Sequence, residues 1–264
     1  FSFTLLLLTI VISGCTLPGT GQTGSGQGVV IENFEVDFPK VYSDETFKLQ
    51  LKMKNTGSVD AWNVYPKLYN VKTDNNQHEI SCTGSCTSYA KLLAQDPERG
   101  TTGQSGTCIW NCRAPAGIPK GISLTFNPSV RLYYGYTTNT AKFVSILSQD
   151  ELRSLQNQGK APPSDTISTS SGPIQVDIVV NGPIRYWENE RRLTFPININ
   201  IVNLGGGVAC PAGNSPDIGV GECDNTENWN KVVIFFGTER KTDITYNCNL
   251  NKNIGEDGNV VELW

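Results

Sequence analysis

The chain has 264 residues, a formal net charge of −4 and 17% charged residues. This mild charge excludes the basic footprint of a nucleic-acid-binding protein, so no nucleic-acid partner is expected. Glycine is plentiful, with 26 residues, whereas histidine and methionine occur once each, a mixture typical of extracellular β-rich proteins. Apart from its leader, the chain is long enough for two domains of ordinary size.

An apolar run from Phe1 to Ile12 opens the chain. It is too short for the roughly 20 residues of a membrane helix but fits the core of a signal peptide. It leads into Ile12-Ser13-Gly14-Cys15, which resembles the lipobox of bacterial and archaeal lipoproteins. The resemblance implies that residues 1–15 are a lipoprotein signal and that lipid on Cys15 anchors the protein at the extracellular face of the cell membrane. The alternative is a cleaved secretory signal or a short anchor, which would change the tether but not the compartment.

A glycine-rich spacer and alternating strands follow the leader. Residues 16–28 hold five glycines and no aromatic residue, and we expect a flexible tether. A strand is predicted over residues 29–38, with inward positions at Phe34, Val36 and Phe38. The next strand alternates more regularly, with Phe47, Leu49, Leu51 and Met53 on one face. Asn55-Thr56-Gly57 predicts a turn, and the returning strand carries Trp62, Val64 and Leu68.

Later segments complete the first predicted sandwich, residues 29–159. Three more strands are expected, over residues 122–126, 130–136 and 142–146. A short helix near 148–158 should begin at Ser148, with Glu151 as its capping-box partner, and end at Gly159. Residues 160–172 are rich in Pro, Ser and Thr and are predicted to be an interdomain linker.

The last third of the chain, residues 173–264, repeats the pattern of the first unit. Ile174, Val176 and Ile178 alternate with polar residues, and a longer stripe follows at Leu193, Phe195, Ile197, Ile199 and Ile201. Asn203-Leu204-Gly205 then stands where Asn55-Thr56-Gly57 stands in the first unit. The repetition predicts an all-β fold of tandem immunoglobulin-like antiparallel β-sandwiches, with one short helix. The final run, residues 260–264, reads as a strand that stops midway, so we expect the second sandwich to be truncated.

The first unit also resembles a known module family. Residues 47–70 are preceded by Tyr-Ser-Asp-Glu-Thr-Phe, with Lys-Asn-Thr-Gly at the turn and Ala-Trp-Asn-Val after it. This segment resembles CARDB-type immunoglobulin-like modules, which are frequent in archaeal surface proteins and occur in some bacterial ones. The resemblance implies a seven-stranded sandwich used in adhesion or as a spacer, with no active site. The chain departs from the family in a cysteine-bearing insertion over residues 74–117.

Four cysteines in this insertion form two C-x3-C pairs: Cys82 with Cys86, and Cys108 with Cys112. A zinc site is the alternative to disulfides, but an oxidising compartment and the commoner C-x2-C spacing of zinc sites favour disulfides. On an extended strand each pair would be about 13 Å apart, beyond the roughly 7 Å that a disulfide allows. Antiparallel segments would instead join Cys82 to Cys112 and Cys86 to Cys108. Alternatively, a tight turn at residues 83–85 would allow a disulfide between Cys82 and Cys86.

The second unit carries three cysteines, an odd number. Cys210 and Cys223 flank a loop rich in Gly, Pro and Asn and are predicted to close it. Cys248 would then pair with a cysteine beyond Trp264, which agrees with a truncated second sandwich.

Signals for chemistry are sparse. The single histidine, His78, lies in a polar run and is better explained as a solvated side chain than as a catalytic base. Asp217, Glu222 and Asp224 share a loop that could hold calcium, but they lack the EF-hand spacing and are better explained as a solvated acidic loop. We expect no catalytic residue, cofactor or metal.

Aromatic side chains are more suggestive of binding. Trp110, between two cysteines, and Tyr134 and Tyr136, on one strand face, are candidates for a binding surface; packing in the core is the alternative.

These features predict a non-catalytic, structural or adhesive surface lipoprotein. Its partners would be the membrane, through Cys15, and other cell-envelope proteins or surface polysaccharide. An accessory lipoprotein that captures a solute or polysaccharide for a transporter or enzyme is the second hypothesis. An extracellular hydrolase is a third.

Overall fold

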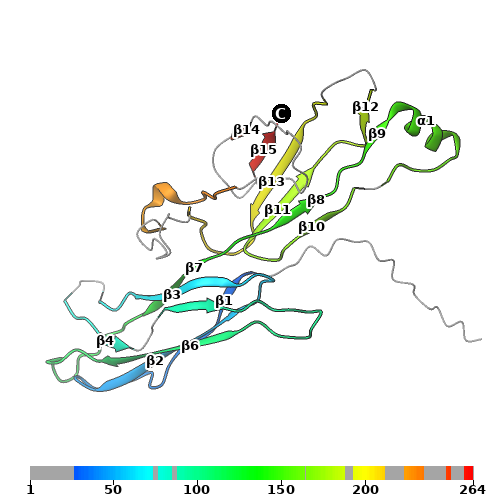
Figure 1. Cartoon of the computed structure of the whole chain (residues 1–264). Helices are drawn as coiled ribbons and strands as arrows, with labels where there is room; N and C mark the ends of the chain where they lie inside the picture. The colour runs from blue at the N-terminus through cyan, green and yellow to red at the C-terminus, as the bar shows by residue number, and fades with distance from the viewer. Residues whose placement is uncertain are drawn as a thin grey trace, which may run out of the picture.

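The computed structural model describes residues 27–73, 77–84, 88–163, 165–187, 193–211, 223–234, 248–250 and 259–263. The predicted signal, with Cys15, and most of the predicted tether lie outside these residues. Strands dominate the described chain, most of their pairings are antiparallel, and two β-rich units follow one another (Figure 1). The all-β prediction is therefore confirmed.

Two sheets form the first unit. Its four-stranded sheet has the order β1-β2-β6-β4 and its three-stranded sheet the order β5-β3-β7. The bounds in the first sheet are β1 Val29–Val36, β2 Thr46–Asn55, β6 Ser105–Arg113 and β4 Ser81–Gly84. In the second they are β5 Tyr89–Leu92, β3 Ala61–Tyr69 and β7 Ser129–Gly135.

The core of this unit is built from alternate residues of β2 and β6. Phe47, Leu49, Leu51 and Met53 are all buried, as the period of two predicts. They pack with Val64 of β3 in one hydrophobic cluster. Removing these side chains from water is the main favourable contribution to the stability of the unit.

Two predictions for the first unit are wrong. Of the three predicted inward positions, only Phe34 packs against the core, whereas Val36 and, beyond the end of β1, Phe38 are exposed. A register shift between Ile31 and Asn33 breaks the regular alternation of this strand, as a β-bulge does. Residues 122–126 form no strand; Phe126 alone among them packs against the core.

The segment 74–117 is not an insertion added to a complete sandwich. It supplies β4, β5 and β6, and β6 lies between β2 and β4. Each of the nine residues of β6 pairs with one of β2, from Ser105↔Lys54 to Arg113↔Thr46. Its buried positions include Cys108, Trp110 and Cys112, which alternate as in any half-buried strand. Hydrophobic burial therefore orders this segment together with its disulfides.

Residues after β7 pair with the second unit. β8, Thr140–Lys142, pairs with β10, Ile167–Thr169, and β9, Ile146–Ser148, pairs in parallel with β12, Ile184–Tyr186. The predicted linker 160–172 thus contains a strand, and the predicted strand 142–146 is replaced by the ends of β8 and β9. The boundary between the units falls between β7 and β8, because the backbone pairs of β8 and β9 are all with later residues.

The predicted helix is present as α1, Gln149–Asn157. The Ser148 side chain accepts a hydrogen bond from the Glu151 amide at 3.2 Å, which satisfies a free N–H of the first turn. Leu152 is buried, and Gly159 follows the helix with φ +64°, a conformation that glycine adopts without strain.

The main sheet of the second unit has the order β11-β13-β15-β14. Its strands are β11 Ile174–Val179, β13 Ile197–Asn203, β15 Asn259–Leu263 and β14 Cys248–Leu250. Ile199 and Ile201 form its buried centre, with Ile174, Val176, Ile178 and Ile197 packed against them. A short 3₁₀ helix, η1, spans Thr226–Asn228.

The two units repeat one strand–turn arrangement at the level of single hydrogen bonds. In the first, Asn55 Oδ1 accepts from the Gly57 amide at 3.0 Å and Asn55 Nδ2 donates to the carbonyl four residues on at 2.9 Å. In the second, Asn203 Oδ1 accepts from the Gly205 amide at 3.0 Å and Asn203 Nδ2 donates to the Gly207 carbonyl at 2.8 Å. The repeated Asn-x-Gly therefore marks repeated local structure.

Candidate functional site

The outward face of the β5-β3-β7 sheet gathers aromatic and basic side chains. We call this the outer face and define it by Trp62, Tyr65, Lys67, Tyr69, Lys91, Arg131 and Tyr133. Its members pair directly across strands: Trp62 with Lys91, Tyr65 with Tyr133, and Lys67 with Arg131. Inward residues of β3, such as Val64, alternate with them and pack on the core. Strand periodicity thus separates a dry face from a face with binding groups.

At one end of the outer face, Trp62 is 50% exposed. The Lys91 ammonium lies 4.8 Å from the centroid of the Trp62 ring and 2.7 Å from a carboxylate oxygen of Asp60. The pKa of Asp60 is lowered, first by the hydrogen bond from Lys91 and then by that from the Ala94 amide. This end therefore presents a flat ring to solvent beside a fixed charge pair.

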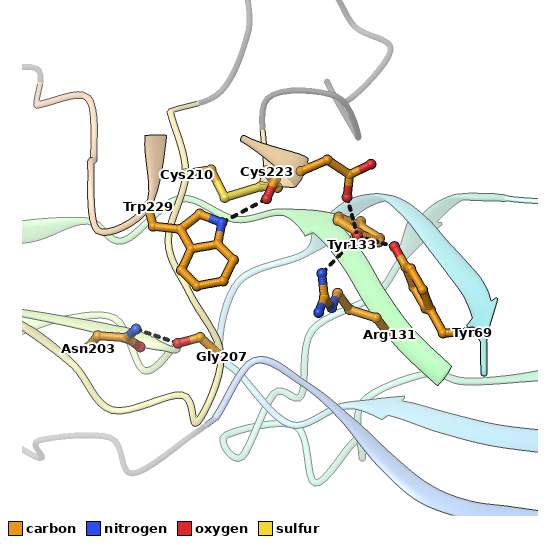
Figure 2. The surroundings of a disulfide bond; sticks show 9 residues. Tyr69, Arg131, Tyr133, Asn203, Gly207, Cys210, Cys223 and Trp229 are labelled. Atoms are coloured by element: carbon orange, nitrogen blue, oxygen red, sulfur yellow. Dashed lines mark hydrogen bonds between the residues drawn. A yellow bond between two sulfur atoms is a disulfide. The ribbon is translucent and has the colours of Figure 1, made fainter. Parts of the chain in front are cut away.

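At the other end, two tyrosine hydroxyls and two cations meet. The hydroxyls of Tyr69 and Tyr133 are 2.6 Å apart, and Arg131 donates to the Tyr133 oxygen at 3.4 Å (Figure 2). Lys67 and Arg131 both lie near the Tyr69 ring, at 5.2 and 5.1 Å from its centroid. Burial, followed by the hydrogen bond with Tyr69, raises the pKa of Tyr133 to about 12.

A carboxylate from the second unit occupies this end. Asp224 accepts a hydrogen bond from the Tyr133 hydroxyl at 2.9 Å and a charge-assisted one from Lys67 at 3.1 Å. These two donors lower the pKa of Asp224, with the Tyr133 contribution the larger. Tyr133 is buried although it is not among the residues packed on the sandwich core, and its hydroxyl contacts Tyr69 and Arg131 of its own sheet and Asp224 of the second unit.

Asp224 directly follows Cys223, which forms the predicted disulfide with Cys210, so this prediction is confirmed. Trp229 then donates its ring N–H to the Cys223 carbonyl at 2.8 Å (Figure 2). The bridge joins residue 223 to a segment that leaves β13, so the position of Asp224 is tied to the second unit. No local sequence signal indicates its partners, since Asp224 lies 91 residues from Tyr133.

For the four cysteines of the segment 74–117, one of the two predicted antiparallel disulfides is confirmed. Cys82 and Cys112 are cross-strand partners of β4 and β6 and form a disulfide with a Cα–Cα distance of 4.0 Å. Cys108 is also disulfide-bonded. Its predicted partner, Cys86, lies outside the described residues, as does the side chain of Cys248.

The predicted binding surface of Trp110, Tyr134 and Tyr136 is wrong. Trp110 is 7% exposed and packs edge-on against Phe34, with ring centroids 6.3 Å apart. Tyr134 and Tyr136 are half-buried and pack against the same core. Trp110 and Tyr134 take inward positions of β6 and β7, and Tyr136 follows β7 directly, so packing accounts for all three. The alternation of β3 from Tyr65 through Lys67 to Tyr69 was the available signal for the outer face, whereas Trp62 does not fit that alternation, because the register shifts between Trp62 and Tyr65.

The remaining candidates do not assemble into a reactive site in the part of the chain that is described. The His78 carbonyl accepts a hydrogen bond from the Thr73 amide, and the His78 amide donates to Thr73 Oγ1. Asp217 and Glu222, proposed with Asp224 for calcium, lie outside the described residues. Within the described ranges, no three His, Cys, Asp or Glu side chains come close enough to hold a metal ion. No helix among them is long and apolar enough to cross a membrane.

Comparison with known proteins adds no family assignment, because neither a protein-family model nor a curated protein matches the chain.

Proposed function

We propose that the protein is a non-catalytic surface lipoprotein of the cell envelope, with a structural or adhesive role. The observation that carries this proposal is the repetition of one strand–turn arrangement in two successive β-rich units, each with a disulfide. Repeated, cross-linked β units give length and resistance to unfolding, which a spacer or adhesin needs outside the cell. Kinship with CARDB-type modules belongs to the same proposal and rests on the sequence around residues 47–70.

The anchor is part of the proposal and has its own test. Cells that produce the protein from its complete coding sequence are fed an alkyne-labelled fatty acid, and the protein is examined for label. Label should be present in the native protein, lost in Cys15→Ser, and kept in the control Cys248→Ser. Unlabelled native protein in a soluble cytosolic fraction would contradict the anchor and the surface location together.

The structural or adhesive role is tested by surface display. Cells that carry the anchored protein should adhere to one another or to a surface more than cells that carry Cys15→Ser, which display none of it. Equal adhesion of the two cell populations would remove the adhesive role and leave a spacer.

Capture of polysaccharide is the second candidate, and the exposed Trp62 beside Lys91 and Asp60 favours it. An aromatic ring flanked by hydrogen-bonding charges suits the apolar and polar faces of a sugar. A polysaccharide that binds only the folded protein should raise its thermal midpoint. Trp62→Ala should abolish this shift, whereas Tyr42→Phe, at a residue that is 84% exposed in the same unit, should leave it unchanged.

A further inference from the structure

Among the described residues, we single out two places where hydrogen bonds link the two units. The first, which we call the joint, consists of Ser58, Tyr136 and Ser171. The Ser58 amide donates to the Ser171 carbonyl at 3.0 Å, and the Ser171 amide donates to Ser58 Oγ at 2.7 Å. The Tyr136 hydroxyl also donates to the Ser171 carbonyl. Hydrogen bonds in both directions, one of them to the Ser58 hydroxyl, thus fix the chain where it passes into the second unit.

Close packing accompanies these bonds. A Cβ atom built at Gly57 or at Gly172 would overlap the ring or hydroxyl of Tyr136. The ring therefore lies between the turn of the first unit and the start of the second. A contact of this size holds one point, but rotation about that point remains possible.

The second contact is the carboxylate of Asp224 on the outer face. We call residues 223–229, which carry it and begin at the disulfide-bonded Cys223, the strap. Tyr133, which holds Asp224, is three residues before Tyr136 of the joint, a separation of roughly 10 Å along an extended chain. Two contacts at this separation remove rotations that one contact permits.

The disulfide makes this second contact effective. Without a link to its own unit, Asp224 could keep its bonds to Tyr133 and Lys67 while the units moved, because a loose loop would follow. Cys223 precedes Asp224 directly and is bonded to Cys210. The Asn230 amide donates to the Ala209 carbonyl at 2.7 Å, which ties the other end of the strap to the same segment. The strap therefore transmits the position of the second unit to Asp224.

We infer that the strap is an intramolecular clamp that holds the two β units at one fixed relative orientation. This inference deepens the proposed structural role, since a spacer with a clamped junction is a stiff rod and one with a free junction is a flexible chain. Its test uses the purified chain in solution and depends on neither lipid nor adhesion. The clamp and the proposed surface role can therefore fail separately.

The test measures a distance between the units. Fluorophores are attached through non-canonical amino acids at Lys48 on β2 and Gln156 on α1, both exposed, so that the native cysteines stay bridged. Single-molecule energy transfer should give one narrow distance distribution for the native chain. Asp224→Ala and the double variant Cys210→Ser with Cys223→Ser should broaden or shift it. The control Asp177→Asn changes an exposed carboxylate on β11 and should leave it unchanged.

Hydrogen exchange of peptides from β2 and β13 shows whether each variant is folded. Tyr133→Phe is the mildest probe, because it removes only the hydroxyl that donates to Asp224, and a broader distribution is expected from it as well. A broad native distribution, or strap variants that are folded but superimpose on the native chain, would overturn the clamp.

Discussion

Replacement of Asn55 by alanine is the sharpest test of the turn that both units share. The Asn55 side chain is fully buried and makes three hydrogen bonds. It donates to the carbonyls of Val59 and Leu92 at 2.9 and 3.0 Å and accepts from the Gly57 amide at 3.0 Å. At about 1 kcal/mol each, the lost bonds cost about 3 kcal/mol, and the buried partners left unsatisfied raise the loss to about 4 kcal/mol.

Asn203 provides the matched control. It occupies the same place in the second unit and makes the equivalent bonds to Gly205 and Gly207, but it is only half-buried. Water can replace the Asn203 amide, so Asn203→Ala should cost only about 1 kcal/mol. Asn55→Asp is a second probe, because the carboxylate keeps the acceptor for Gly57 and loses both donors.

The assay is urea unfolding followed by pulsed hydrogen exchange and mass spectrometry. A peptide from β2 reports the first unit and a peptide from β13 the second, so each variant is compared within its own unit. Asn55→Ala should lower the midpoint of the β2 peptide far more than Asn203→Ala lowers that of the β13 peptide. A loss below about 1 kcal/mol for Asn55→Ala, or equal losses for the two variants, would refute the argument from burial.

Three further outcomes are expected. Absorbance titration should show a tyrosine with a pKa of about 12 that disappears in Tyr133→Phe. Because the pKa of Tyr133 is raised in the folded protein, its contribution to stability is complete below the ordinary tyrosine value near 10 and is lost as pH rises through about 12. The pKa of Asp224 is lowered, so the clamp should stay closed above the ordinary aspartate value of about 3.9 and open only as pH falls through the lower folded value, which the distance measurement would detect. Non-reducing peptide mapping should find Cys86 linked to Cys108, because the antiparallel register that joins β4 to β6, carried on by two residues, brings position 86 opposite Cys108; free thiols there would contradict it.

Several features follow from short stretches of sequence because their causes are local. The alternation of Phe47, Leu49, Leu51 and Met53 specifies both a strand and its buried face, whatever lies across from it. The helix follows in the same way from the Ser148 cap and the glycine after its last turn. The Cys82–Cys112 disulfide was one of the pairings that the sequence allowed. Two cysteines of one C-x3-C pair on the same extended strand lie too far apart to form a disulfide, which favours pairing between strands.

Long-range partners explain what the sequence left open or suggested wrongly. The run with Cys108, Trp110 and Cys112 has the alternation of a buried strand, but its cysteines also suit a stapled loop, and only pairing with β2 distinguishes the two. The burial of Trp110 follows from that pairing. The predicted linker became a strand for the same reason, because β8 offered β10 an edge to pair with.

The site itself depends most on tertiary structure. Tyr133, Lys67 and Asp224 come from three distant parts of the chain, and nothing near Asp224 indicates which donors it meets. The alternation of apolar and polar residues reveals which face of a strand is buried, because that pattern is local in the sequence. Which charged side chain lies against the outer face depends on how the two units pack. The free energy of that packing comes from contacts between residues far apart in sequence.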